Sequence, residues 1–171
     1  MMEDWMWVLL LFLISQRLAE LILAKQNEQW MKNQGAIEVG KDHYKWFVLV
    51  HSFFFISLIL ESMHFNETAT FSLIYFSLFV ITQLIRFWCI ATLGRYWNTK
   101  IIVLPGAKLI KKGPYRYIKH PNYIIVGLEL IIIPLLFGAY MTAFIFITLH
   151  LILLRTRIPI EEEALGRTSK I

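Results

Sequence analysis

The chain has 171 residues, of which 57% are hydrophobic and 17% are charged, and its mean hydropathy is +0.57. A soluble domain of this size would leave large apolar patches facing water, so the composition argues against that class and indicates a protein that lies in lipid. The net charge of +5 requires no nucleic-acid partner, because membrane topology and contact with anionic lipid account for it. The single cysteine, Cys89, argues against an internal disulfide or a cysteine-based metal site.

Apolar stretches follow one another along the chain at residues 5–23, 44–60, 71–93, 123–133 and 141–154. The first and third reach the roughly 20 residues that a span needs. The last two are shorter and nearly adjacent, which predicts a tight helical hairpin. Because lipid leaves backbone groups no water to bind, and no alternating strand pattern is visible, we predict helices. We expect an all-α integral membrane protein of about five transmembrane helices, forming a single domain over residues 1–171.

Basic residues gather in every second connection and in the tail. They are Lys25, Lys32, Lys41 and Lys45; Arg95, Lys100, Lys108, Lys111, Lys112, Arg116 and Lys119; and Arg155, Arg157, Arg167 and Lys170. The N-terminus and the stretch from Glu61 to Thr70 contain no lysine or arginine. The positive-inside rule then predicts an external N-terminus and a cytoplasmic C-terminus. No basic n-region precedes the first helix, so no cleavable signal is expected.

Charged side chains within the apolar stretches cost about 2.5 to 3.5 kcal/mol each on insertion scales, so each requires a partner. They are Arg17, Glu20, Arg86 and Glu129. Arg17 and Glu20 share one helix face. They form either a structural ion pair, with snorkelling as a variant, or part of a water-accessible cavity. The sequence leaves these alternatives open.

The histidines are scattered over the chain at His43, His51, His64, His120 and His150. None forms the i, i+4 pair that holds a metal ion on a helix, so we expect no metal site. His43 and His51 bracket the start of the second helix. They either pack or form hydrogen bonds at the membrane interface, or they line the site described next.

Two polar elements flank the predicted hairpin. The first runs from Lys111 to Tyr123, and its Gly113 and Pro114 indicate a turn. Its Pro121 suits the first position of a helix, and the free amides at that helix end would attract a carboxylate or phosphate. The second is the Arg157–Leu165 segment, which the hairpin would return to the same membrane face. Taken singly, the first is equally a basic juxtamembrane loop, and the second a solvated helix start whose glutamates complement the helix dipole.

Together, Gly-Pro-Tyr-Arg-Tyr-Ile-Lys-His-Pro-Asn-Tyr at residues 113–123 and Arg-Ile-x-x-Glu-Glu-x-x-Leu at residues 157–165 resemble the isoprenylcysteine carboxyl methyltransferase family. The resemblance covers mainly residues 96–165, the expected catalytic core. The earlier Gly35-to-Gly40 segment, followed by His43 and His51, is similar to the small bacterial branch. Some members of that branch resemble partners of type III polyketide synthases that O-methylate long-chain alkylpyrones.

The resemblance implies methyl transfer from S-adenosylmethionine to an oxygen of a lipophilic acceptor, either an alkylpyrone-type hydroxyl or an isoprenylcysteine carboxylate. A polyketide synthase would be a pathway partner. Arg157 would be the catalytic residue that orients the acceptor oxygen, and His51 would contact the acceptor. The residues implied at the cytoplasmic cofactor site are Leu109, Ile110, Tyr115, His120, Pro121, Tyr123 and Glu161, with Glu162 as a second candidate for the place of Glu161.

Physical chemistry supports these roles. Attack on a sulfonium methyl group requires alignment and exclusion of water, and arginine holds an anionic oxygen while remaining charged. This chain has Lys119 where the family commonly has arginine, and it lacks the aromatic stretch that usually follows Leu165 in the family. We therefore expect either that this branch dispenses with that stretch or that it retains the cofactor weakly.

Two other classes remain open from the sequence. A small multi-pass transporter or channel subunit would use Glu20 or Glu129 as an intramembrane cation or proton site. A purely structural membrane protein would tolerate changes at His120 or Arg157. Neither alternative explains the two polar elements together, so the methyltransferase is the favoured interpretation.

Overall fold

The structure, a computed structural model, describes residues 3–64 and 71–168, with side chains up to residue 166. Most of the predicted connection from Glu61 to Thr70, and Lys170 of the basic tail, lie outside these residues. The elements in chain order are α1 (Asp4–Asn33), β1 (Ile37–Val39), α2 (Lys41–His64), α3 (Leu73–Leu93), the 3-10 turn η1 (Gly94–Tyr96), β2 (Ile101–Val103), the 3-10 turn η2 (Gly113–Arg116), α4 (Pro121–Leu136) and α5 (Tyr140–Thr168).

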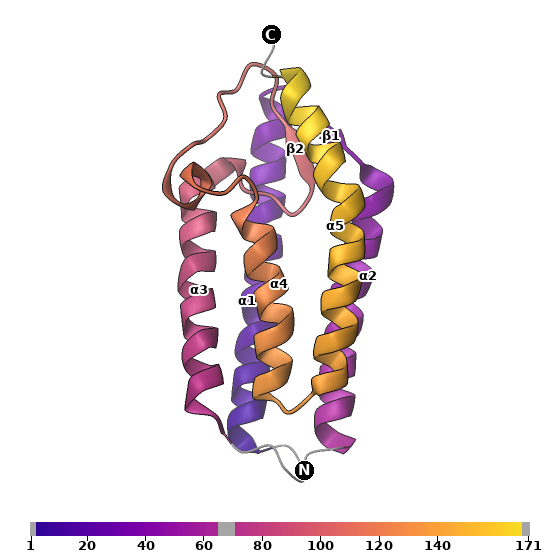
Figure 1. The fold of residues 1–171 in the computed structure, drawn as a ribbon. Helices are drawn as coiled ribbons and strands as arrows, with labels where there is room; N and C mark the ends of the chain where they lie inside the picture. Colours follow the sequence, from indigo (N-terminus) through magenta and orange to yellow (C-terminus); the bar gives the residue numbers. More distant parts are fainter. Residues whose placement is uncertain (1–2, 65–70, 169–171) are drawn as a thin grey trace.

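The helices form one upright bundle in which their direction alternates along the chain (Figure 1). α1 begins at one end of the bundle and α5 finishes at the other. Helices α1, α2, α3 and α5 are each long and apolar enough to cross a membrane, whereas α4 has only 16 residues. The all-helical membrane class is thus supported. The number of crossings, their orientation and the single-domain assignment stay predictions.

Apolar side chains cover the outside of the bundle as well as its interior. Val8, Ile74 and Phe144 are 70%, 72% and 72% exposed, as expected for a surface that faces lipid rather than water. The inner core lies toward the end where α1 begins. Its buried residues include Met6, Leu10, Leu13, Phe54, Leu58, Phe79, Leu130, Ile133, Leu136, Phe137 and Phe146.

The predicted hairpin is formed by α4 and α5, which are joined by residues 137–139. The expected end of the last helix near Leu154 is wrong, because α5 continues to Thr168 and includes Pro159. The Arg157–Leu165 segment is therefore part of α5 rather than a new helix start. Proline removes one backbone hydrogen bond from a helix, but the extension lies against β1 and β2, and Ile160 lies next to Gly40, the residue that follows β1.

A two-stranded sheet closes the bundle at the end where α5 finishes (Figure 1). β1 and β2 are antiparallel, with Ile37 opposite Val103 and Val39 opposite Ile101. Neither strand was predicted, since three residues are too few to show the two-residue period of a strand. The sheet ties the α1–α2 connection to the segment after α3, and so it brings both halves of the chain to the same end.

Candidate active site

Arg157 is fixed at the end of the hairpin by contacts from three parts of the chain. Its Nε donates to the hydroxyl of Tyr123 at 2.7 Å, and its Nη2 donates to the carbonyl of Thr99 at 2.6 Å. The guanidinium carbon lies 4.7 Å from the ring centre of Phe47 on α2. Arg157 is only 7% exposed. Several of its five N–H donors have no acceptor among the described residues, so a buried cation with free donors faces the site.

Tyr123 links Arg157 to the acidic element. Its hydroxyl donates to Glu161 while accepting from Arg157. The ring of His120 stacks on that of Tyr123 with centroids 5.5 Å apart, and His120 Nδ1 lies 3.9 Å from a carboxylate oxygen of Glu161. The two polar elements predicted from the sequence therefore meet across the hairpin, as expected.

The two candidate glutamates occupy different environments. The Glu161 side chain is 25% exposed and faces Tyr123, whereas that of Glu162 is 45% exposed and binds Lys119 at 3.3 Å and His120 at 3.4 Å. The geometry favours Glu161 as the inner carboxylate, with Glu162 at the rim. Lys119, which stands in place of arginine, makes a single ion-pair contact there.

The start of α4 presents unoccupied hydrogen-bonding groups. Pro121 is its first residue, and no side chain caps this helix end. The Tyr123 amide donates to the His120 carbonyl at 3.2 Å, whereas the Asn122 amide has no acceptor within the helix and can bind an anion. Nearby, Tyr115 Oη and Asn122 Oδ1 are buried and have no hydrogen-bond partner among the described residues. Burial, with the neighbouring Cys89 and Glu161, raises the pKa of the Tyr115 phenol above its usual range. Such orphaned polar atoms indicate a place for a polar ligand.

Gly113 allows η2 to lie close to α3. Its φ is +52°, and a Cβ at this position would be 2.6 Å from Thr92 Oγ1. Only glycine adopts this conformation readily and leaves the required space, so this residue sets the position of Tyr115, two residues later. The sequence indicated a turn here but not its close packing.

Two predicted cofactor residues lie apart from the rest. Leu109 is 49% exposed, and both it and Ile110 belong to the segment that arcs from β2 to η2 at the end of α3 (Figure 1). Neither is hydrogen-bonded to the groups around Tyr123 in the described structure. Their role as cofactor ligands stays a prediction.

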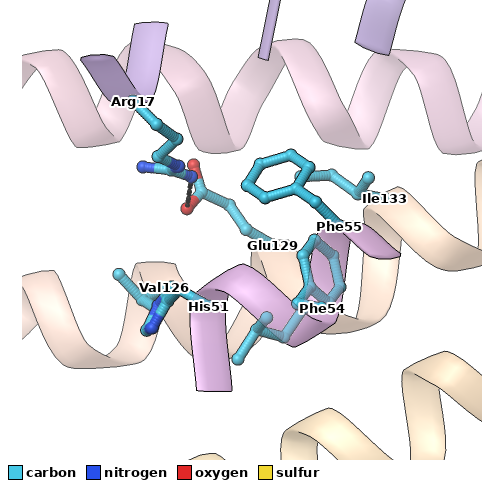
Figure 2. Close-up of a pocket in the computed structure, with 8 residues that line it drawn as sticks. Arg17, His51, Phe54, Phe55, Val126, Glu129 and Ile133 are labelled. Carbon is cyan, nitrogen blue, oxygen red and sulfur yellow. Dashed lines mark hydrogen bonds and ion pairs between the residues drawn. The ribbon is translucent and has the colours of Figure 1, made fainter. Parts of the chain in front are cut away.

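His51 lies one turn deeper than Phe47 on α2, where its Nδ1 is 2.8 Å from the Phe47 carbonyl. It lines a small pocket together with Arg17, Glu129 and Phe55 (Figure 2). The volume of this pocket, about 10 Å³, admits one water molecule at most. His51 is thus adjacent to the Arg157 site but not in hydrogen-bond contact with Arg157, and its contact with an acceptor stays a prediction.

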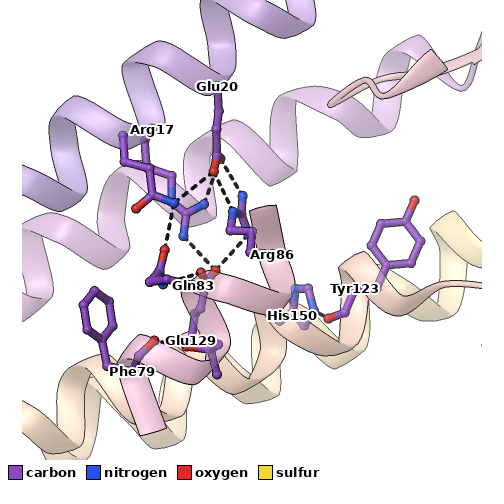
Figure 3. A network of polar contacts seen from close by, with 10 residues as sticks. Arg17, Glu20, Phe79, Gln83, Arg86, Tyr123, Glu129 and His150 are labelled. Atoms are coloured by element: carbon purple, nitrogen blue, oxygen red, sulfur yellow. Dashed lines mark hydrogen bonds and ion pairs between the residues drawn. The ribbon is translucent and has the colours of Figure 1, made fainter. Parts of the chain in front are cut away.

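Four charged side chains from α1, α3 and α4 form a cluster inside the bundle, in which all but Arg17 are buried (Figure 3). Arg86 donates to Glu20 at 2.6 Å and to Glu129 at 2.8 Å, and Arg17 binds the same two glutamates at 2.9 and 2.7 Å. Gln83 donates to Glu129 at 2.8 Å. Of the alternatives that the sequence left open, the ion pair between Arg17 and Glu20 is present, within a larger network of two arginines and two glutamates that has no net charge.

Sequence reasoning missed three contributors to the site: Thr99, Phe47 and His150. Thr99 acts through its backbone carbonyl, for which residue type gives no signal. Phe47 resembles any other aromatic residue of an apolar stretch. His150 Nε2 lies 3.1 Å from the carbonyl of Tyr123, and only the pairing of α4 with α5 would have indicated this contact.

Comparison with known proteins identifies the class to which this arrangement belongs. The isoprenylcysteine carboxyl methyltransferase family matches residues 73–167, from the start of α3 almost to the end of α5. This range is more than half of the chain and contains both polar elements. The chain therefore belongs to the isoprenylcysteine carboxyl methyltransferase family, which confirms the resemblance found in the sequence.

Two relatives extend the similarity over nearly the whole chain. "Uncharacterized protein YpbQ" of Bacillus subtilis (strain 168) is 46% identical over 164 residues, which are 95% of this chain and 98% of the relative. An "Uncharacterized protein" of Haemophilus influenzae is 29% identical over 159 residues, covering 90% of this chain and 91% of its own length. No solved structure matches the chain significantly.

Replacing Arg86 by methionine should destabilise the protein strongly, because Glu20 and Glu129 would both lose a buried partner. We expect a loss of about 3 to 5 kcal/mol in the free energy of unfolding. The measurement is unfolding in detergent. The matched control is Arg155→Met, at an exposed arginine of α5, which should change the free energy by less than about 0.5 kcal/mol. Equal losses in the two variants would contradict a structural role for the cluster.

Gly113→Ala should lower the stability of the protein more than Gly106→Ala does. Both glycines have positive φ, but a Cβ at Gly106 would meet nothing within 4 Å. The control thus carries the backbone strain of about 1 to 2 kcal/mol without the clash against Thr92. Thermal unfolding of the two variants measures the difference. Equal unfolding temperatures would show that η2 can move away from α3 at no cost.

Proposed function

We propose that this protein is an S-adenosylmethionine-dependent O-methyltransferase that acts on a lipophilic acceptor in the membrane. The observation that carries the proposal is the continuous contact from Arg157 through Tyr123 to Glu161 at the end of the α4–α5 hairpin. It places a buried cation next to a carboxylate, and it lies within the residues that match the family. Membership in a membrane methyltransferase family supplies the reaction class.

The residues around the start of α4 fit this cofactor. The uncapped helix end, with the Asn122 amide, suits its carboxylate, and Glu161 suits its amino group or ribose hydroxyls. The orphaned Tyr115 Oη and Asn122 Oδ1 offer further polar contacts, with His120 beside them. When bound, S-adenosylmethionine supplies an electrophilic methyl group on a positively charged sulfur.

Arg157 would hold the acceptor oxygen in its anionic form. Its contacts to Tyr123 and Thr99 fix the guanidinium, while its free N–H groups point a positive charge toward the reacting oxygen. Burial beside Phe47 keeps water away and so strengthens that attraction. An enolate-like alkylpyrone oxygen and an isoprenylcysteine carboxylate both meet these requirements, and neither needs a separate strong base.

The transporter alternative loses its main support. Glu20 and Glu129, the intramembrane acids on which it relies, each bind both Arg17 and Arg86. Carboxylates that are fully compensated by fixed arginines are poor sites for a mobile cation or proton. The methyltransferase proposal also includes a cytoplasmic site in a bacterial plasma membrane, an external N-terminus and a polyketide synthase as pathway partner.

Cofactor binding should depend on Glu161. We expect Glu161→Gln to weaken binding of S-adenosylmethionine by about 10- to 100-fold, as for the loss of a charge-assisted hydrogen bond. Titration of the detergent-solubilised protein measures this affinity. Glu163→Gln, at an exposed glutamate two residues further along α5, is the matched control and should bind normally. A well-folded wild type that does not bind the cofactor would refute the proposal.

Methyl transfer should depend on Arg157. Arg157→Ala is expected to retain cofactor affinity within about threefold but to lower the transfer rate by about 100-fold or more, which is the usual cost of removing a group that stabilises a developing charge. Transfer of a radiolabelled methyl group to an alkylpyrone and to a prenylcysteine measures the rate and identifies the acceptor class. Arg155→Ala serves as the control for loss of an arginine from α5. Unchanged transfer in Arg157→Ala would contradict the assigned role.

A further inference from the structure

A second, larger cavity opens between α1, the start of α2 and the segment before β2. Its volume is about 440 Å³, and it is lined by Leu21, Ala24, Lys25, Glu28, Gln29, Lys32, Tyr44, Thr99 and Lys100. None of these residues has a role in the chemistry proposed above, except that Thr99 supports Arg157 through its carbonyl. The cavity contains too many lysines to be a void left by imperfect packing.

The charges of this cavity leave a positive excess. Lys32 and Lys100 bind two glutamates between them, Glu28 and Glu38. Burial opposes ionisation of Glu38, but hydrogen bonds from these lysines hold its pKa below its usual range, so it stays charged. Lys25 has no ionic partner among the described residues. Three lysines thus face two glutamates, and one positive charge is left for a ligand.

Lys25 and Lys32 of the cavity lie on the same face of α1 as an exposed leucine. Arg17, Leu21, Lys25, Glu28 and Lys32 follow one another at intervals of three or four residues, which places them on one helix face. Arg17 belongs to the smaller, aromatic-lined pocket deeper in the bundle (Figure 2). From the end of the bundle inward, this face presents charged residues as far as Lys25 and then Leu21, which is 47% exposed. Arg17, one turn further on, is bound by Glu20 and Glu129. The order of lysine and then exposed leucine matches an amphiphile with an anionic head that lies along the outside of α1.

We propose that this cavity binds the phosphate of an anionic phospholipid from the bilayer, with Lys25 as the main cation and an acyl chain lying over Leu21. Lysine binds phosphate as a compact point charge, and basic groups at a membrane boundary attract anionic lipids. This inference does not rest on the proposed catalytic function.

A lipid bound here would also support the candidate active site. The Tyr44 hydroxyl lies 3.2 Å from Thr99 Oγ1, and the Lys100 ammonium lies 5.7 Å from the Tyr44 ring centre. Thr99 in turn accepts a hydrogen bond from Arg157. A headgroup that orders Lys100 and Tyr44 would thus hold the Thr99 carbonyl against Arg157.

The test is a titration of dioleoylphosphatidylglycerol or dioleoylphosphatidylcholine into the detergent-purified full chain, with the unfolding temperature as the signal. The anionic lipid should saturate the wild type at a lower concentration than the neutral one. Lys25→Ala should weaken the anionic lipid about fivefold, which corresponds to about 1 kcal/mol for one lysine. Lys25→Arg should restore binding. Lys41→Ala, at an exposed lysine outside the cavity, should bind as the wild type does.

Four results would overturn the proposal. Equal saturation by the two lipids would show that the headgroup charge is not recognised, and equal losses in Lys25→Ala and Lys41→Ala would show that the cavity is not the site. A full response to inorganic phosphate alone would assign the site to a soluble anion. Weaker binding of an alkylpyrone to Lys25→Ala, without any effect of the anionic lipid, would assign it to the acceptor. Unfolding of each variant without added lipid controls for misfolding.

Discussion

The fold depends first on the position of Arg86 between two glutamates. Its guanidinium, on α3, binds Glu20 of α1 and Glu129 of α4 at 2.6 and 2.8 Å, and all three residues are buried. Lipid provides no hydrophobic force to hold one apolar helix against another, so packing and polar contacts must do this. An unpaired charge at this depth would be costly, and only a narrow range of helix heights and rotations satisfies both glutamates. The cluster therefore sets the relative position of α1, α3 and α4.

That constraint extends to the candidate active site because α4 carries one residue of the cluster and one residue of the site. Glu129 lies in the cluster, and Tyr123 lies less than two turns away on the same helix. α5 is then positioned by the short hairpin, which brings Arg157 to Tyr123. The small sheet completes the arrangement: β2 leads out of the segment whose Thr99 carbonyl binds Arg157, and Gly40 after β1 receives Ile160. Contacts from three distant parts of the chain thus fix one guanidinium.

The sequence predicted those features that depend on local pattern. Apolar runs marked the membrane helices, the short gap after residue 133 marked the hairpin, and the two motifs marked the residues that meet there. It did not predict what tertiary contacts decide. Three-residue strands carry no period, the extension of α5 through Pro159 is stabilised by packing on the sheet, and a backbone carbonyl such as that of Thr99 has no residue signature. The partners of Arg86, Glu20 and Glu129, were also not predicted, because any intramembrane glutamate would satisfy the same charge argument.

The residues around Arg157 come from two parts of the chain. Tyr123, Arg157 and Glu161 lie within residues 73–167, which the family shares. Phe47, whose ring lies against the Arg157 guanidinium, and Tyr44, which contacts Thr99, belong to α2, and the lysine cavity belongs mainly to α1. Glu20 anchors α1 to Arg86, so the same buried cluster that positions α4 also holds α1 against the residues that the family shares. The surroundings of the Arg157 guanidinium are thus completed by residues from inside and outside the family-matched region, and a substitution of Phe47 would alter them without changing the contact between Tyr123 and Glu161.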